Sequence, residues 1–255
     1  MFISKLFAKD REAKVGHREL SAQNLTVRFQ GLSAISNVTL SVGGNEIFGL
    51  IGPNGAGKTT LVNCLAGFQK PTEGRILFQG HDTSRWAAKT FRREGIARTF
   101  QAGRLFKDMT VLENVLVTGI ALRMGSHEAK TQARVLLDWI GLGDKCDQPA
   151  SSLAYTDQRR LGIARALMVS PAFVLLDEPA AGMSDAETEE LMGIISEMPK
   201  KFDCSVMLIE HNMHLVMSIC NRIHVLDGGK TLAEGSPEEI KRHEAVIGAY
   251  LGMEE

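Results

Sequence analysis

The sequence has no long hydrophobic run, few cysteines and almost no net charge, and each shortage argues against a class of protein. No apolar stretch approaches the roughly 18 residues that cross a bilayer, so we expect the chain not to enter a membrane by itself. Basic and acidic residues number 29 and 30, for a net charge of -1. Because this balance exerts no general pull on polyanions, we expect no nucleic-acid partner.

Cysteine is also scarce, and the four residues (Cys64, Cys146, Cys204 and Cys220) form neither a CxxC pair nor a tight cluster. This spacing favours reduced, mostly buried thiols in a cytosolic protein. The opening segment mixes apolar residues with charges and lacks the apolar core of a secretory signal. We therefore treat residues 1–19 as an N-terminal extension, either a frayed terminus or a short helix with one apolar face.

The residues that are present describe an ordinary globular protein: 44% of the 255 are hydrophobic and 23% are charged. Alternating and apolar runs predict early strands at 25–29, 36–42, 43–52 and 74–80. In the last third, predicted strands at 173–177 and 205–210 alternate with helices at about 185–198 and 212–220. Strands that alternate with helices predict an α/β fold with a mostly parallel sheet.

The stretch from about 104 to 170 has helical periodicity throughout and carries no flanking linker. We interpret it as a helical subdomain inserted into the α/β core rather than as a separate domain.

A glycine-rich loop provides the strongest functional signal. Residues 52–59 read GPNGAGKT and fit the G-x-x-x-x-G-K-[ST] pattern, after an apolar strand and before a predicted helix. Backbone N–H groups of such a loop cradle phosphates, Lys58 would reach the terminal phosphates, and the hydroxyl of Thr59 would bind Mg²⁺. A nucleotide and Mg²⁺ are therefore the predicted cofactors. The predicted nucleotide contacts are Gly52, Pro53, Asn54, Gly55, Ala56, Gly57, Lys58, Thr59 and Thr60.

A second signal is the apolar strand FVLLDEP at 173–179, which ends in two carboxylates. The carboxyl ends of strands in an open α/β sheet line the ligand crevice. We therefore predict that Asp177 holds Mg²⁺ and that Glu178 is the general base for water. The alternative is that the Asp-Glu-Pro sequence only ends a strand and begins a helix.

With these motifs, the segments RTFQ (98–101), 153–167, 177–188 and IEHNM (209–213) make residues 20–253 resemble the ATP-binding subunit of an ABC transporter. The resemblance implies a P-loop ATPase core with a mostly parallel sheet, an antiparallel β subdomain and an inserted α-helical subdomain. It also implies roles for Gln101 at Mg²⁺ or the attacking water, His211 at the γ-phosphate, Ser184 in the D-loop and Phe29 on adenine.

The residues alone leave other interpretations open for three of these positions. Gln101 could be a solvated loop residue and Phe29 a core side chain. His211 and His214 have the i, i+3 spacing of a helical metal pair, although the sequence offers no evident third ligand.

The segments near 105–115 and 153–167, and the C-terminal AEGSPEEI, are similar to the ATPase subunits of branched-chain amino acid importers. That resemblance implies ATP hydrolysis coupled to import of branched-chain amino acids or a related small solute, at the cytoplasmic face of the bacterial plasma membrane. The implied partners are a second ATPase subunit, two membrane permeases and, indirectly, a periplasmic solute-binding protein. The ATPase of lipopolysaccharide export is the alternative.

One departure from the family concerns the signature loop, which reads Leu153-Ala154-Tyr155-Thr156-Asp157. Thr156 stands where the family has the glycine that lets backbone approach the partner's phosphate, and a β-branched residue adds bulk there. Its hydroxyl could replace the lost contact as a phosphate donor, or cap the helix. The sequence predicts that this signature closes weakly on the partner's ATP.

Overall fold

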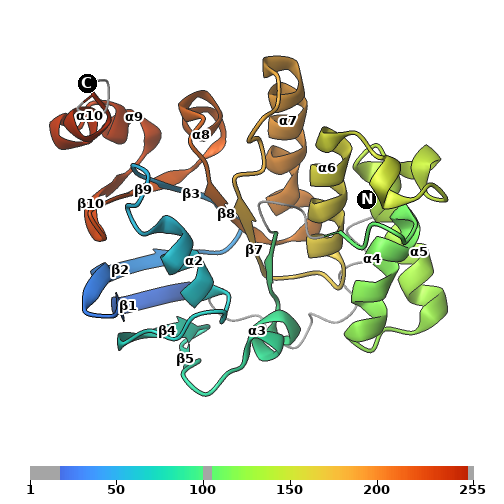
Figure 1. Ribbon diagram of the computed structural model, residues 1–255, viewed down its shortest axis with the longest axis horizontal. Coiled ribbons are helices and arrows are strands. Elements are labelled where there is room, and N and C mark those ends of the chain that lie inside the picture. Colours follow the sequence, from blue (N-terminus) through green and yellow to red (C-terminus); the bar gives the residue numbers. More distant parts are fainter. Residues whose placement is uncertain (1–17, 100–104, 252–255) are drawn as a thin grey trace.

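The computed structural model describes residues 18–99 and 105–251 and contains two sheets (Figure 1). The smaller, antiparallel sheet has the order β2-β1-β4-β5. Its strands are β1 (Leu20–Phe29), β2 (Leu32–Val42), β4 (Glu73–Phe78) and β5 (His81–Asp82). This is the antiparallel β subdomain that the family resemblance implies.

The larger sheet has six strands in the order β10-β9-β3-β8-β7-β6. Their bounds are β3 (Ile47–Ile51), β6 (Ile96–Arg98), β7 (Phe173–Asp177), β8 (Ser205–Ile209), β9 (Arg222–Asp227) and β10 (Lys230–Gly235). Every neighbouring pair is parallel except β9 with β10. The predicted mostly parallel sheet is therefore confirmed. Every residue of β3, β7 and β8 is buried, as expected for strands covered on both faces.

Between β6 and β7 the chain passes through the helices of the predicted insertion (Figure 1). These are α4 (Val111–Ala121), α5 (Ser126–Trp139) and α6 (Tyr155–Leu167), with 3₁₀ turns at Gly143–Lys145 and Ala150–Ser152. The remaining helices are α2 (Lys58–Leu65), α3 (Ala88–Glu94), α7 (Asp185–Phe202), α8 (Met213–Ile219), α9 (Pro237–Lys241) and α10 (Glu244–Leu251).

Two hydrophobic cores lie on opposite faces of the large sheet, because successive strand residues point to opposite sides. On β7, Val174 and Leu176 belong to the core that continues into the inserted helices. Phe173 and Leu175 belong to the core that includes the antiparallel sheet and α2. The inserted helices therefore share a core with the large sheet, which agrees with their interpretation as a subdomain.

Element bounds differ from the sequence prediction in a few places, for local reasons. The helix expected after the glycine loop, for which the sequence pattern continues to residue 68, ends as α2 at Leu65, because Gly67 takes a positive φ of 76° that stops the helix. Helix α7 continues past Pro199 to Phe202, whose buried ring packs 4.7 Å from that of Trp139. The short elements β5, β6, α3, α9 and α10 were not predicted.

Candidate functional site

Three adjacent parallel strands bring the predicted site together at one edge of the large sheet. Strand β8 lies between β3 and β7, and Ile209 is in register with both Leu50 and Asp177. The glycine loop follows β3, His211 lies in the loop after β8, and Asp177 ends β7 with Glu178 directly after it. The sheet therefore places the three sequence motifs side by side, at the carboxyl ends where α/β folds bind ligands.

Two glycines of the loop are required by close backbone packing. A Cβ on Gly52 would lie 2.0 Å from the carbonyl oxygen of Leu226, and one on Gly57 would lie 2.6 Å from that of Ala34. Both residues also have positive φ angles, 149° and 98°. Gly57 is the N-cap of α2 and is capped by no side chain, so the helix presents its first N–H groups toward the loop.

Lys58 is the first residue of α2 and is only 6% exposed. Its ammonium donates to the carbonyl oxygens of Gly52 at 2.6 Å and Pro53 at 2.9 Å. Burial lowers its pKa, while the negative charges of Glu178 and Asp177 oppose that shift. The ammonium thus lies within the electrostatic reach of both predicted acidic residues. Of the other loop residues, Asn54 and Thr59 are exposed and Thr60 is half-buried.

Asp177 is buried and forms an ion pair that sequence reasoning did not assign. The guanidinium of Arg98, at the end of β6, lies 2.7 Å from Oδ2 of Asp177, and the two side chains are 6% and 7% exposed. The same guanidinium donates to Oδ1 of Asn63 on α2. Among the described residues, no hydrogen bond or ion pair engages Oδ1 of Asp177, so that oxygen remains for a metal ion or its water.

Glu178 and His211 face each other across the same edge. Oε1 of Glu178 lies 3.0 Å from Nε2 of His211, and the backbone N–H of Glu178 donates to Ile209. Glu178 has a φ of 47°, a left-handed conformation that side-chain-bearing residues rarely adopt. Such strain is often found at functional sites, which agrees with the predicted role of this residue.

Glu210 is a site residue that sequence reasoning missed, although it lies in the quoted IEHNM segment. It is 3% exposed, and its carboxylate accepts hydrogen bonds from the N–H groups of Ala180 at 2.7 Å and His211 at 3.1 Å. Burial raises its pKa, and these hydrogen bonds oppose the shift. Glu210 therefore ties the loop after β7 to the loop after β8. A charged residue at the end of an otherwise apolar strand was the available signal.

The signature loop differs from expectation in the use of its polar side chains. Ala154 is the N-cap of α6, so the Thr156 hydroxyl does not cap the helix; it donates to the carboxylate of Glu187 on α7. Asp157 is buried and pairs with Lys145 at 2.5 Å. Its charge is thus largely balanced inside the subunit rather than directed at an incoming phosphate.

The other predicted residues lie on other elements or outside the described part of the chain. Phe29 is 48% exposed at the tip of the β1–β2 hairpin and is not a core residue. Ser184 is the N-cap of α7. His214 pairs with Glu189 at 2.9 Å, and within the described ranges no cluster of three metal-ligating side chains includes it. Gln101 lies outside the described residues.

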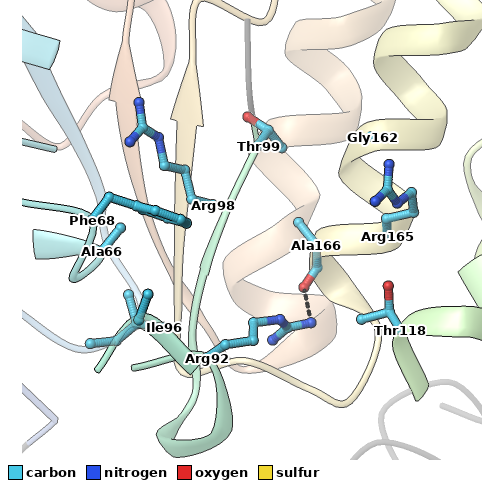
Figure 2. Close-up of a pocket in the computed structure, with 11 residues that line it drawn as sticks. Ala66, Phe68, Arg92, Ile96, Arg98, Thr99, Thr118, Gly162, Arg165 and Ala166 are labelled. Atoms are coloured by element: carbon cyan, nitrogen blue, oxygen red, sulfur yellow. Dashed lines mark hydrogen bonds between the residues drawn. The ribbon is translucent and has the colours of Figure 1, made fainter. Parts of the chain in front are cut away.

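A groove of about 230 Å³ opens where the α/β core meets the inserted helices (Figure 2). Arg98 and Phe68 line its core side, with the guanidinium 5.8 Å from the ring centroid. Arg165 and Gly162 of α6 line the opposite side. Arg92 lies below and donates to Ala166 at 3.1 Å. The groove therefore reaches from Arg98, beside the Asp177 carboxylate, to the inserted helices.

All four cysteine thiols are free and buried, as the spacing of the cysteines predicted. None of the helices in the described ranges combines the length and the hydropathy that a bilayer crossing requires.

Comparison with known proteins agrees with this geometry. The ABC transporter family matches residues 35–181, and a family described as branched-chain amino acid ATP-binding cassette transporter matches residues 230–252. The chain is 46% identical over 248 residues to the high-affinity branched-chain amino acid transport ATP-binding protein LivG of Escherichia coli K12, covering 91% of this chain and 97% of LivG. It is 32% identical over 234 residues to the lipopolysaccharide export system ATP-binding protein LptB of Haemophilus influenzae, covering 91% and 97%.

Solved structures give the same result. The crystal structure of the ADP conformation of MJ1267, an ATP-binding cassette of an ABC transporter, superposes with a TM-score of 0.83 at 28% identity, covering 92% of this chain and 99% of that one. The family match, the identity to LivG and the shared fold agree with one another. The chain therefore belongs to the ABC transporter family, as an ATP-hydrolysing, ATP-binding subunit of the type that includes LivG.

Proposed function

We propose that this chain hydrolyses ATP to drive import of branched-chain amino acids or a related small solute. The observation that carries the proposal is the grouping of Lys58, Asp177, Glu178 and His211 at one sheet edge, in a chain 46% identical to LivG over nearly its whole length. The alternative, lipopolysaccharide export, has less support because identity to LptB is 32%.

The loop fits a triphosphate. Gly55 has a φ of 81°, and a Cβ built on it would meet nothing within 4 Å, so the backbone is open to a ligand. The Lys58 ammonium now binds two carbonyl oxygens of its own loop. Phosphate oxygens carry full negative charge and form stronger hydrogen bonds to an ammonium than neutral carbonyls do. We therefore infer that Lys58 exchanges these carbonyls for the terminal phosphates, and that Gly52 to Thr60 surround the rest.

Magnesium fits the same edge through few protein ligands. Mg²⁺ in nucleotide sites takes one or two carboxylates among its few protein ligands, and otherwise phosphates and water. The exposed Thr59 hydroxyl and Oδ1 of Asp177 are suitable donors, with Gln101 as the third proposed ligand. Bound Mg·ATP would supply the phosphoryl group that water attacks and a cation that offsets its charge. Phe29, exposed on its hairpin, would stack on the adenine.

The chain's own residues then position the water and its proton. Glu178 would accept the proton from the attacking water, because its backbone N–H is fixed by the Ile209 carbonyl and its carboxylate contacts His211 at the site. His211 would hold Glu178 in place and donate toward the γ-phosphate. Gln101 would help orient the water. Glu210 fixes the backbone of both loops and does not itself touch substrate.

The subunit is proposed to work as part of a complex on the cytoplasmic face of the bacterial plasma membrane. A second ATPase subunit would complete each ATP site with its signature loop, and two permeases would dock on the pair, served by a periplasmic solute-binding protein. We propose the groove between the core and the inserted helices as the permease contact, since it begins at residues that immediately precede Gln101. Residues 20–253 would form the ATPase domain and 1–19 an extension.

Calorimetric titration of the purified subunit with Mg·ATP tests the nucleotide site. The parent chain should give saturable heat, which Lys58→Ala should abolish and Lys70→Ala, at an exposed lysine after α2, should retain. No saturable binding by the parent, with its partner subunits present, would refute the proposal. In the reconstituted transporter, stimulation of ATP turnover by branched-chain amino acids with the binding protein would support import; stimulation by lipopolysaccharide alone would favour export.

A further inference from the structure

The Thr156 hydroxyl meets a carboxylate that already holds a second loop. Oε1 of Glu187 accepts the hydrogen bond from Thr156. Oε2 of the same carboxylate accepts from the backbone N–H and the hydroxyl of Ser184, both at 2.8 Å, in the capping box of α7. One side chain therefore joins the second residue of α6 to the N-cap of α7.

Further contacts run along the same pair of helix ends. One turn beyond Thr156, the guanidinium of Arg160 pairs with Glu190, which lies one turn beyond Glu187. At the other end, a Cβ on Gly182 would lie 3.5 Å from the ring of Tyr155, so the loop before α7 touches the start of α6. Thr156 and Glu187 thus lie at the centre of a continuous contact between the two helix ends.

The charge of Glu187 suits this position. Its pKa is lowered to about 2, first by the Thr156 hydroxyl and then by the Ser184 groups, so it is ionised at neutral pH. A carboxylate in the first turn of α7 is also favoured by the positive end of the helix dipole. The hydrogen bond from Thr156 is therefore charge-assisted, which makes it stronger than one between neutral groups.

We propose that Thr156 and Glu187 are positioning residues that join the signature loop (153–157) and the loop 180–184 into one unit, which the second ATPase subunit meets as a preformed surface. The inference rests on the proposed function, in which the signature loop meets that subunit, and the contacts of Glu187 hold the loop 180–184 beside it. Ordering two separate loops on closure would cost conformational entropy, and the contact within this subunit removes part of that cost beforehand. The hydrogen bond of the Thr156 hydroxyl thereby offsets part of the weaker closure that we expect from the lack of a glycine at this position.

Bulk and hydrogen bonding at position 156 can be separated by substitution. Thr156→Val keeps the branched shape and removes the donor, whereas Thr156→Ser keeps the donor and removes the methyl group. Thr156→Gly changes both at once and cannot distinguish them. Glu187→Gln keeps a side chain that can still cap α7 while removing the charge.

The experiment uses the purified transporter with fluorescent labels on this subunit and its partner ATPase subunit. Energy transfer between the labels measures closure of the two ATPase subunits as the Mg²⁺ complex of a non-hydrolysable ATP analogue is added. The affinity for Mg·ADP is measured separately, because it depends on the phosphate loop and not on the partner's signature loop. We expect Thr156→Val and Glu187→Gln to raise the analogue concentration for half-closure about tenfold, and Thr156→Ser to stay within about twofold of the parent. The double variant Thr156→Val/Glu187→Gln should be no worse than either single change, because the two residues act through one contact.

Mg·ADP affinity should be unchanged in every variant. General destabilisation of the subunit would weaken both closure and Mg·ADP binding, so it would not produce this result. Closure of Thr156→Val at the parent concentration would overturn the inference while leaving the proposed function intact. A parent transporter that binds no Mg·ADP and does not close would overturn the proposed function and the inference with it.

Discussion

At the scale of single residues, the proposed chemistry depends most on Glu178. Replacing it by glutamine keeps the shape and the contact with His211 but removes the base. We expect ATP turnover to fall by about 10²–10⁴-fold, as for other positioned bases, while Mg·ATP binding is retained. Turnover is measured by phosphate release and binding by calorimetry. Hydrolysis at the parent rate would contradict the assignment of Glu178.

The buried pair of Arg98 and Asp177 gives a prediction on stability. Arg98→Met would leave the Asp177 carboxylate buried without its cation, which typically costs about 3–5 kcal/mol. The control is Arg28→Met, because Arg28 pairs with Glu73 at a site where the two side chains are 47% and 57% exposed. An exposed pair contributes only about 0–1 kcal/mol. Urea unfolding measures both; equal losses in the two variants would contradict the importance of burial.

The same residues show how far the site could be predicted from the sequence. The glycine loop and the Asp177–Glu178 pair lie at the ends of apolar strands, and parallel strands bring their ends together, so local pattern was enough to group them. His211 was assigned only through the family resemblance. Arg98 is 79 positions from Asp177, and Thr156 is 31 positions from Glu187. No periodicity connects such pairs, because their contact is created only by the packing of whole elements.

At the scale of elements, the strand and helix pattern was predictable where runs were long. All five residues of β7 are buried, and the first four form an apolar run that ends at the expected position, before Asp177. Strand β6 has three residues, too few to show alternation, and α3 has seven. Both become regular structure because the large sheet and its core provide partners, which local sequence does not reveal.

The start of α7 gives a prediction on pH dependence. The pKa of Glu187 is lowered from 4.5 to about 2 in the folded protein, so its contribution to stability is present above pH 4.5 and is lost as the pH falls toward 2. The melting-temperature difference between the parent and Glu187→Gln should therefore be largest above pH 5 and should narrow as the pH falls below 4. Thr156→Val, which removes the main cause of the shift, should reproduce part of this dependence. A constant difference from pH 6 to 3 would contradict it.

At the scale of the whole molecule, the site and the groove are connected through Arg98. Its guanidinium pairs with Asp177 at the sheet edge and also lines the groove between the core and the inserted helices (Figure 2). The inserted helices share a close-packed core with the large sheet. A shift of the groove residues would therefore also displace the packed helices and strands. This arrangement would provide a physical route between the proposed permease contact and the proposed nucleotide site.

The groove itself can be tested with a glycine of α6 that lines it. A Cβ on Gly162 would meet nothing within 4 Å, so Gly162→Phe should fold and place its ring in the cavity of about 230 Å³. We expect Mg·ADP binding by the isolated subunit to be unchanged and recovery of the permeases in a membrane pull-down to fall at least fivefold. Gly193→Phe is the matched control, because Gly193 lies on α7 with equally open space and does not line the groove. If both variants recover the permeases equally, the permeases dock elsewhere; if both lose them, the loss reflects the added aromatic ring and not its place in the groove.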